Sequence, residues 1–349
     1  MGFVIVGSVM IAWALIASLY TYYTNKLVNT PAQFSFFIFY TLYLLLAFSF
    51  WEGDYDPKDI IATYLFFVFI PILVVNLHSR HSTFELAINH ALRAFFLLFS
   101  LAIFYHAFRY GIDWTRPTFF NLDFFHKNGV SAIYEIVYIY ILFKNKKSSK
   151  KVISLIIFIG MSCIVIIGSK TTFGLATLFT IGFFSRSLFV VLSLITLGVL
   201  VYLVFFFEDY SKSPFRTASY RGLLWRQAWK EIVASKTTFF LGNGPGSFVS
   251  TVKEYDLFGM EGTHNYILQI MHNYGLSGLL VFGVFFRNLW KRFGLFASPA
   301  AVAFWMFNLH ALFDVGWIKG TGFFASLFLG IAIVIAIVQK NDKKEPLIL

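Results

Sequence analysis

Residues 187–207 read SLFVVLSLITLGVLVYLVFFF, a stretch without a charged side chain. It is long enough to cross a lipid bilayer, because a spanning helix needs about 20 mostly apolar residues. The same alternation of apolar run and polar break continues along the chain and gives eleven candidate helices. The other ten occupy residues 2–23, 34–51, 60–77, 86–108, 131–143, 152–168, 172–185, 265–286, 297–313 and 320–338.

Two of these runs, 131–143 and 172–185, are shorter than a bilayer crossing requires, so we expect each to be tilted, extended by its polar flank or re-entrant. The first run has no basic residue before it and no convincing cleavage site, which favours a retained helix over a signal peptide. The predicted fold class is an all-α polytopic membrane protein with about 10–12 transmembrane helices. We expect residues 1–349 to form a single transmembrane domain.

Composition supports a membrane protein and excludes several other classes. Of the 349 residues, 58% are hydrophobic and 13% are charged, whereas a soluble protein carries roughly a quarter charged residues. The single cysteine, Cys163, leaves no intrachain disulfide and no thiolate metal cluster. The net charge of +11 is spread between hydrophobic runs and forms no nucleic-acid module, so we expect membrane lipids and phosphate groups as partners and no nucleic acid.

The basic residues between the runs predict which loops face the cytosol, because Lys and Arg resist translocation. A cluster at 144–151 anchors the prediction, and the alternation of runs then places the other basic groups on the same side. The groups are Lys144, Lys146, Lys147, Lys150 and Lys151, then Arg186, then Arg287, Lys291 and Arg292, and finally Lys340, Lys343 and Lys344. The N-terminus and residues 52–59, 109–130, 168–171, 208–264 and 314–319 are expected outside.

The longest polar stretch is the predicted extracytoplasmic loop 208–264. Because it carries basic and acidic residues together, a solvated loop is one interpretation of it. Residues 219–235 within this loop are expected to form an amphipathic helix. Leu224, Ala228 and Ile232 would share one face of that helix, with Trp225 and Trp229 beside them at the membrane interface.

Arg221 lies one helical turn before the first of these tryptophans. Two interpretations are open for it: an arginine of an interfacial helix that extends toward water, or a forked donor that grips a phosphate bidentately, which Lys cannot copy. The helix leads into residues 241–248, LGNGPGSF, whose backbone amides are a weak candidate for anion binding. The chain has no Walker A loop and no dinucleotide fingerprint, so we expect no role for ATP.

Residues 263–278, THNYILQIMHNYGLSG, mark the point where the long loop meets a membrane helix. His264 sits at this water boundary, where an imidazole can titrate near neutral pH and accept a proton from a sugar hydroxyl. His272 lies deeper and is expected to be a packed structural residue. Gly275 and Gly278 are expected to let another helix approach closely.

The spacing of His264-Asn265, nine residues, Gly275, two residues and Gly278 resembles the His-[Asn/Ser/Gln]-x9-Gly-x2-[Gly/Thr/Tyr] motif of the bacterial O-antigen ligase/polymerase family. The stretch from Arg221 to Phe248 is similar to the Arg-rich periplasmic segment of that family. The clear resemblance covers about residues 165–280. The chain departs from the family pattern at Lys170. The family usually has an arginine at this point, followed three residues later by leucine.

The resemblance implies a GT-C-like helical fold and a metal-independent glycosyltransferase without a cofactor. It also implies a location in the bacterial inner membrane, with the active site facing the periplasm or exterior. The donor would be a glycan on undecaprenyl pyrophosphate, and the acceptor a lipid A core sugar for a ligase or another lipid-linked repeat for a polymerase. By position, His264 looks like the essential histidine of the family and Arg221 like its pyrophosphate-binding arginine. Lys170, with Arg216 or Arg226 assisting, would add positive charge at the departing diphosphate.

Three further residues are weaker candidates. His310 and Asp314 are four residues apart near the outer end of the tenth run. Either Asp314 orients His310, or the two side chains simply satisfy each other's hydrogen bonds. Arg109 ends the fourth run on the same side and is a candidate to line the path of the lipid carrier. Residues 54–56, Asp-Tyr-Asp, resemble the acidic pair with which nucleotide-sugar transferases hold a metal, but they are expected outside, so we predict no metal site.

The predicted reaction is a single displacement at an anomeric carbon. His264 would deprotonate the acceptor hydroxyl, which inverts the configuration of the sugar. The motif spacing favours a ligase slightly by association, and a polymerase stays open. A transporter of lipid-linked glycans or polysaccharide is the alternative from another class, expected to show paired inverted halves with broken helices. A structural assembly partner is a third alternative.

Overall fold

The computed structural model describes residues 31–51, 57–80, 83–112, 127–205, 216–253, 259, 262–313 and 321–342. Within these ranges every regular element is a helix and no strand occurs. The first predicted run, 2–23, lies outside the described residues. For the described part of the chain, the predicted all-α class is confirmed.

Each of the other ten predicted runs coincides with a helix. Their bounds are α2 (Pro31–Ala47), α3 (Pro57–Tyr64) continued by the π-helical turn η1 (Leu65–Phe69) and α4 (Ile70–Arg80), α5 (Phe84–Tyr110), α6 (Lys127–Lys144), α7 (Lys150–Ile167), α8 (Lys170–Phe184), α9 (Arg186–Phe205), α12 (Tyr266–Arg292), α13 (Pro299–Ala311) and α14 (Thr321–Asp342). Two more helices, α10 (Arg216–Ile232) and α11 (Lys236–Leu241), lie within the predicted loop 208–264.

Not every apolar helix is long enough to cross a bilayer. By length and composition, four segments of the described chain qualify as membrane spans: Lys58–His78, Phe84–Tyr110, Lys150–Ile167 and Tyr266–Arg292. Helix α13 has only 13 residues, which at about 1.5 Å per residue is well short of a hydrocarbon core of about 30 Å. The sequence therefore predicted apolar helices correctly, whereas its count of 10–12 spans is not matched in the described residues.

Large apolar side chains remain exposed along several helices. Leu42 on α2, Leu98 and Phe108 on α5, Phe158 on α7 and Leu194 on α9 are each more than half exposed. Exposed apolar surface of this extent is typical of a face that contacts lipid or another protein. With the four span-length helices, this surface indicates a membrane protein.

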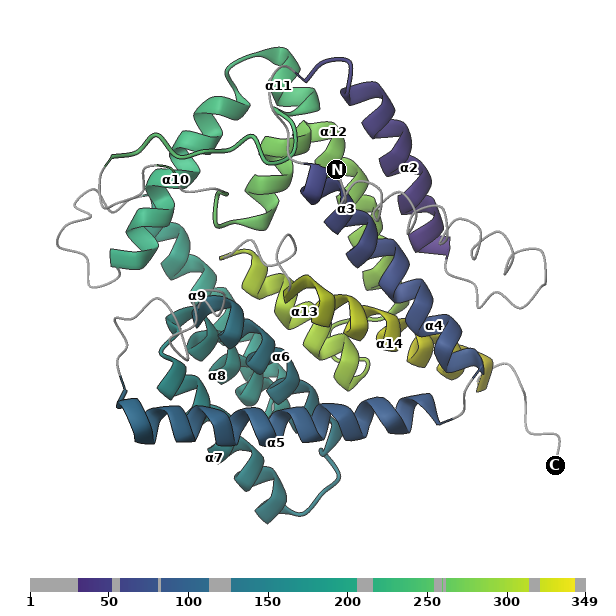
Figure 1. Cartoon of the computed structure of the whole chain (residues 1–349), viewed down its shortest axis with the longest axis vertical. Coiled ribbons are helices and arrows are strands. Elements are labelled where there is room, and N and C mark those ends of the chain that lie inside the picture. Colours follow the sequence, from purple (N-terminus) through teal and green to yellow (C-terminus); the bar gives the residue numbers. More distant parts are fainter. Residues whose placement is uncertain are drawn as a thin grey trace.

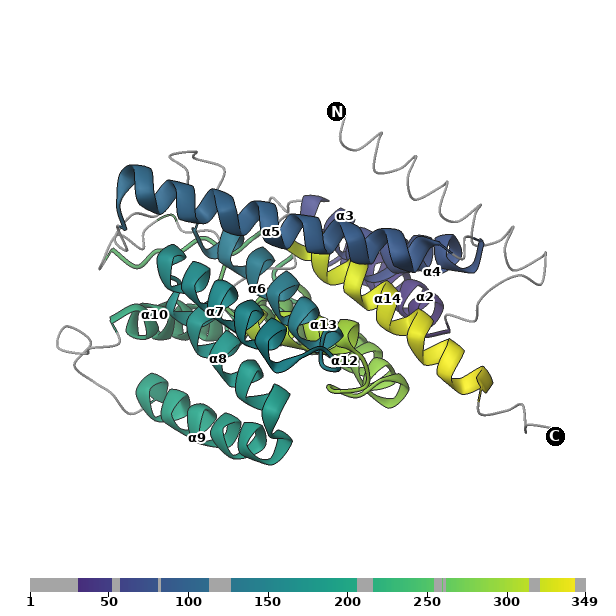
Figure 2. The same cartoon turned by 90° about the horizontal axis from the view of Figure 1, so that it is seen from below.

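Helix α6 lies near the centre of the fold, where it packs against α5, α7, α8, α13 and α14 (Figure 1). Its residues 136–142 are all buried, as expected for a helix surrounded by others. Helix α9 lies at the margin, where it contacts α8 and α10 (Figure 2). Helix α10, which contacts α9, also contacts α12.

The loops predicted to face the cytosol meet at one end of the bundle. The Lys146 ammonium lies 5.9 Å from the ring centroid of Phe183, and the Arg186 guanidinium lies 5.2 Å from that of Phe296. These contacts join the α6–α7, α8–α9 and α12–α13 connections. At the opposite end of α8, Thr171 contacts Arg221 in α10. The grouping of the basic loops therefore agrees with the predicted alternation, and their cytosolic location stays a prediction.

Candidate functional site

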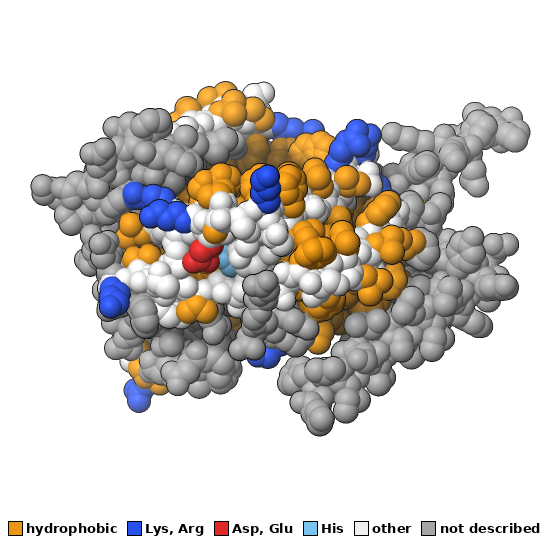
Figure 3. Space-filling view, turned by 90° about the horizontal axis from the view of Figure 1, so that it is seen from above, with side chains coloured by type: hydrophobic (Ala, Val, Ile, Leu, Met, Phe, Trp, Pro, Cys, Tyr) orange, Lys and Arg blue, Asp and Glu red, His pale blue; other side chains and the backbone are white. Residues whose placement is uncertain are grey.

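Helix α10 has the amphipathic face that the sequence predicts. Leu224, Ala228 and Ile232 are fully buried, while Trp229 is 48% exposed. In Figure 3, which views the molecule from the top of Figure 1, hydrophobic side chains cover a broad area with Lys and Arg side chains among and around them. Such a mixed surface suits the boundary between lipid and water.

Arg221 contacts the residue that follows Lys170. Its Nη1 donates to Oγ1 of Thr171 at 3.4 Å, and Lys170 and Thr171 begin helix α8. The Arg221 side chain is half-buried, and that of Lys170 is exposed. The fold therefore brings to one place two basic residues that are far apart in the sequence.

The start of α8 adds a further positive end to this place. Ser169 caps the helix by accepting a hydrogen bond from the backbone N–H of Thr172 at 3.5 Å. The N-terminus of an α-helix carries the equivalent of roughly half a positive charge. A guanidinium, an ammonium-bearing residue and a helix N-terminus thus lie at one site, a combination that favours an anion such as a phosphate.

The structure does not show the two assisting arginines at the start of α8. Arg216 is the first residue of α10, and its side chain lies outside the described residues. Arg226 is exposed and is displaced from Arg221 by about 140° around the helix, at about 100° per residue. It therefore points away from the face that carries Arg221, and its role at the diphosphate stays a prediction.

His264 occupies a strained turn immediately before α12. Its backbone φ is 52°, and among the described residues it is the one non-glycine residue with a positive φ. An L-residue pays about 1–2 kcal/mol for this left-handed conformation. Neighbouring hydrogen bonds hold the turn: Oγ1 of Thr263 donates to the Asn265 carbonyl at 2.8 Å, and Asn265 caps α12 by accepting from the Leu268 N–H at 2.9 Å. Strain of this kind collects at functional sites.

Two contacts show that α10 and the start of α12 run side by side in the same direction. Leu268 packs against the cluster formed by Leu224, Ala228 and Phe248. Farther along both helices, Glu231 of α10 contacts His272 of α12. The N-terminal ends of the two segments therefore lie at the same end of the pair. Arg221 lies in the N-terminal part of α10, and His264 lies just before the N-terminus of α12.

His272 is the packed structural residue that the sequence predicts. It is only 1% exposed, and its Nε2 lies 2.7 Å from Oε2 of Glu231. Its ring packs perpendicular to that of Phe248, with the ring centroids 5.2 Å apart. Burial alone raises the pKa of Glu231, but hydrogen bonds with His272 and Gln227 outweigh it and hold the pKa below its ordinary value. The charged form of Glu231 is therefore the one that this contact favours.

Helix α12 is broken at Gly275, whose φ of 64° and ψ of −168° are not helical. The break leaves carbonyl groups of the first half without helical partners. The backbone N–H groups of Asn243 and Gly244 donate to the carbonyls of His272 and Asn273 at 2.8 and 3.1 Å. The hydroxyl of Tyr43 donates to the backbone carbonyl of Tyr274 at 2.7 Å. Two amides of the glycine-rich stretch thus cap a broken helix, and anion binding by this stretch stays a prediction.

His310 has a buried partner that local spacing does not reveal. Its Nδ1 lies 2.8 Å from Oε2 of Glu135 on α6, and both side chains are almost fully buried. Asp314, the partner expected from the sequence, lies outside the described residues. Glu135 was missed, although a single acid inside the apolar run 131–143 is a signal by itself, since ionisable residues within membrane segments are rare and usually functional.

The remaining candidates are not joined to this site. Arg109 is exposed in the last turn of α5, a helix that packs mainly against α6 and α7. Residues 54–56 lie outside the described ranges. Within those ranges, no group of three or more His, Cys, Asp or Glu side chains is arranged to hold a metal ion.

Comparison with known proteins does not extend this picture. The chain matches no protein-family model and no curated protein sequence.

Proposed function

We propose that this chain is a membrane glycosyltransferase of the O-antigen ligase type, with a GT-C-like fold. It moves a glycan from an undecaprenyl-pyrophosphate carrier to a sugar hydroxyl of the lipid A core, on the outer face of the bacterial inner membrane. The observation that carries the proposal is the contact of Arg221 with Thr171, which sets a guanidinium next to Lys170 at the start of α8. The resemblance of residues 165–280 to that family supports the same conclusion.

The donor side of the reaction requires positive charge. A diphosphate is a good leaving group when its developing charge is stabilised, so fixed cations lower the barrier. Arg221 supplies a planar fork that can hold two phosphate oxygens, whereas Lys170 supplies a point charge. The N-terminus of α8, the positive end of its helix dipole, favours the same anion.

The acceptor side requires a base. His264 removes the proton of the acceptor hydroxyl while that oxygen attacks the anomeric carbon, so one displacement inverts the configuration there. The support is its position: a partly exposed imidazole in a strained turn, at the same end of the α10–α12 pair as Arg221. General-base assistance of this kind contributes roughly 10²–10⁴-fold to the rate.

The break in α12 favours a second candidate, a transporter of lipid-linked glycans, because transporters build their sites from broken helices. In this chain, however, carbonyls next to the break accept hydrogen bonds from Asn243, Gly244 and Tyr43. Those carbonyls already have partners within the protein. A glycosyltransferase therefore accounts better for the clustered Arg, Lys and His residues.

The test is a transfer assay with purified protein in detergent, a radiolabelled undecaprenyl-pyrophosphate glycan and no ATP. Product linked to lipid A core identifies a ligase, and longer carrier-linked glycan identifies a polymerase of the same family. If neither product forms but the protein moves the donor across proteoliposome membranes, the chain is a transporter and the proposal is wrong.

A further inference from the structure

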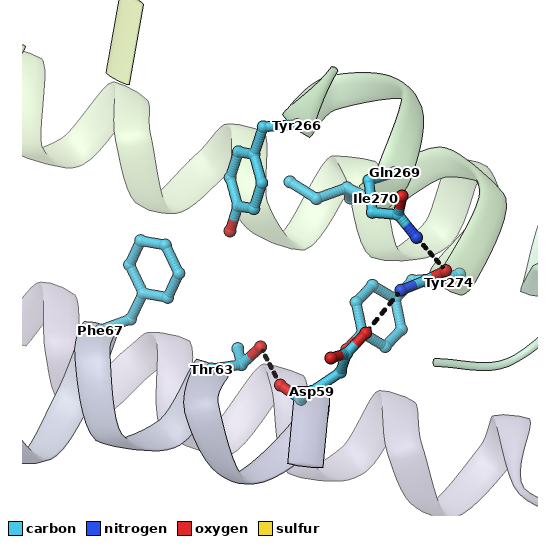
Figure 4. A pocket seen from close by; sticks show the side chains of 8 residues that line it. Asp59, Thr63, Phe67, Tyr266, Gln269, Ile270 and Tyr274 are labelled. Atoms are coloured by element: carbon cyan, nitrogen blue, oxygen red, sulfur yellow. Dashed lines mark hydrogen bonds between the residues drawn. The ribbon is translucent and has the colours of Figure 1, made fainter. Parts of the chain in front are cut away.

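A small pocket with polar and apolar lining residues lies between α3, η1 and the first half of α12 (Figure 4). Its internal free volume of about 10 Å³ is close to the space that one water molecule needs. The lining residues are Asp59, Thr63, Phe67, Tyr266, Gln269, Ile270, Asn273 and Tyr274. Asp59 is 7% exposed, so its side chain lies inside the protein instead of at a loop surface.

A continuous chain of hydrogen bonds leads from this aspartate to the turn at His264. Nδ2 of Asn273 donates to Oδ2 of Asp59 at 3.3 Å. Nε2 of Gln269 donates to Oδ1 of Asn273 at 2.9 Å, and the backbone N–H of Thr263 donates to Oε1 of Gln269 at 2.7 Å. Asn273 and Gln269 are 3% exposed or less, and Thr263 is fully buried. We call this chain of four residues the relay.

The two ends of the relay fix the direction of every bond within it. A backbone N–H can only donate, so Gln269 must present its oxygen to Thr263. An ionised carboxylate can only accept, so Asn273 must present its NH₂ group to Asp59. The oxygen of Asn273 then faces the NH₂ group of Gln269, and all three bonds agree in direction. The direction imposed by the Thr263 N–H therefore requires an acceptor at position 59, and the Asp59 carboxylate supplies it.

The relay ends where the backbone is strained. Thr263 directly precedes His264, whose φ of 52° is left-handed. The hydroxyl of Thr263 donates to the Asn265 carbonyl at 2.8 Å and also accepts from the Asn265 N–H at 3.3 Å. Anchoring the Thr263 N–H thus fixes one side of the turn, while the cap at Asn265 fixes the other. A strained turn persists only when its surroundings hold it in this way.

We propose that Asp59 is a positioning residue for His264, acting through Asn273, Gln269 and Thr263. Asp59 supplies the terminal acceptor that the direction of the relay requires, and the relay holds the turn that presents the imidazole. The effect on catalysis rests on the proposed function, because it requires His264 to act on a substrate. The effect on the turn itself does not depend on that function.

The experiment measures backbone hydrogen exchange at Thr263 in the purified, detergent-solubilised full chain. Asp59→Asn keeps the shape of the side chain but replaces the charged terminal acceptor with a neutral amide, which accepts more weakly and can turn its NH₂ group toward Asn273. We expect Thr263 to exchange about tenfold faster, the effect of losing one buried hydrogen bond. Thr63→Val is the matched control: Thr63 lines the same pocket and its hydroxyl donates to the Asp59 carbonyl in α3, but it takes part in none of the three bonds of the relay. Exchange at Thr263 should not change in this variant.

A charge exchange between two positions tests directly whether the relay needs a carboxylate acceptor. Asn273→Asp alone places two carboxylates together, so exchange at Thr263 should also accelerate. In the double variant Asp59→Asn/Asn273→Asp, residue 59 donates to the carboxylate at 273, which again can only accept from Gln269. Exchange should then return to within about threefold of the wild-type rate, and the effects of the two substitutions should be strongly non-additive.

Two results overturn the proposal: unchanged exchange in Asp59→Asn, or a double variant that exchanges as fast as the faster single one. If Asn273→Asp does not fold, the comparison of Asp59→Asn with Thr63→Val decides. The transfer assay separates this proposal from the proposed function. Asp59→Asn should lower kcat with little change in KM for the lipid donor, because Arg221 and Lys170 are untouched. Faster exchange with no transfer activity in any variant would leave the positioning role in place and reject the glycosyltransferase.

Discussion

Nε2 of His272 lies 2.7 Å from Oε2 of Glu231 and joins the broken helix α12 to the interfacial helix α10. Gln227 strengthens the join, since its side chain donates to Oε1 of Glu231 at 2.7 Å and to the Val249 carbonyl at 3.1 Å. The helix that carries Arg221 is therefore held to the helix that His264 precedes. Loss of this contact should loosen the candidate site before it unfolds the bundle.

We expect Glu231→Ala to lower thermal stability modestly. A hydrogen bond to a charged group contributes about 1.5–3 kcal/mol, and the 37% exposure of Glu231 reduces this through solvent screening to about 1 kcal/mol. Glu231→Gln should lose less, because its amide oxygen still accepts from His272. Thermal unfolding in detergent measures both, and equal stability of Glu231→Ala and wild type would contradict the argument.

The same contact should depend on pH. The pKa of Glu231 is lower in the folded protein than in the unfolded chain, so the unfolded chain binds more protons in this range and stability rises with pH. The contribution is present above about pH 4.5, the ordinary value of a glutamate, and is lost as the pH falls through the folded pKa. The stability difference between wild type and Glu231→Gln should therefore shrink below about pH 4.5. A constant difference down to pH 3 would assign the effect to packing.

Arg221→Lys should reduce transfer strongly although the charge is kept. The planar fork is lost, and a bidentate bond to a charged group corresponds to roughly 10–100-fold in rate. Lys230→Ala is the control, since Lys230 is exposed and lies about 180° around α10 from Arg221. Steady-state turnover of the lipid-linked donor measures both variants. Near-normal turnover in Arg221→Lys would identify Arg221 as an interfacial residue that reaches toward water.

His264→Asn should abolish most activity without disturbing the fold. Asparagine tolerates the left-handed conformation that residue 264 adopts, whereas alanine adds strain. An amide cannot act as a base, so transfer should fall by about 10²–10⁴-fold. His90→Asn, at an exposed position on α5, is the matched control. A loss smaller than about fivefold in well-folded His264→Asn would remove His264 from the mechanism.

Periodicity made the local features of this fold predictable. The apolar runs became helices, and the buried face of α10 at Leu224, Ala228 and Ile232 follows from residues spaced by four. The basic loops were predictable for the same reason, because each lies next to an apolar run. Periodicity does not show whether a helix is long enough to cross a bilayer. Short helices such as α13 were therefore counted as spans.

The long-range contacts were not predictable. His310 has Asp314 four residues away, yet the described structure pairs it with Glu135, 175 residues away in the sequence. The break in α12 likewise depends on groups outside the helix, since Tyr43 and the backbone of residues 243–244 satisfy the carbonyls it exposes. A single sequence without these partners shows only a glycine in an apolar run, which is equally typical of close helix packing.

Gly275→Ala tests whether the break in α12 is a requirement of the fold. A Cβ at this position would lie 2.5 Å from the carbonyl carbon and oxygen of Phe240 and 2.6 Å from the backbone nitrogen of Gly242. These are backbone atoms that cannot rotate away, and the φ of 64° adds strain for any residue with a Cβ. We expect a loss of several kcal/mol, seen as lower yield and a much lower unfolding temperature.

Gly283→Ala in the same helix is the matched control, because a Cβ there would meet nothing within 4 Å. It should leave the unfolding temperature unchanged or slightly higher, since alanine has the better helix propensity. If Gly275→Ala were as stable as Gly283→Ala, the loop at residues 241–244 could move away from α12 at little cost. The break in α12 would then not be a requirement of the fold.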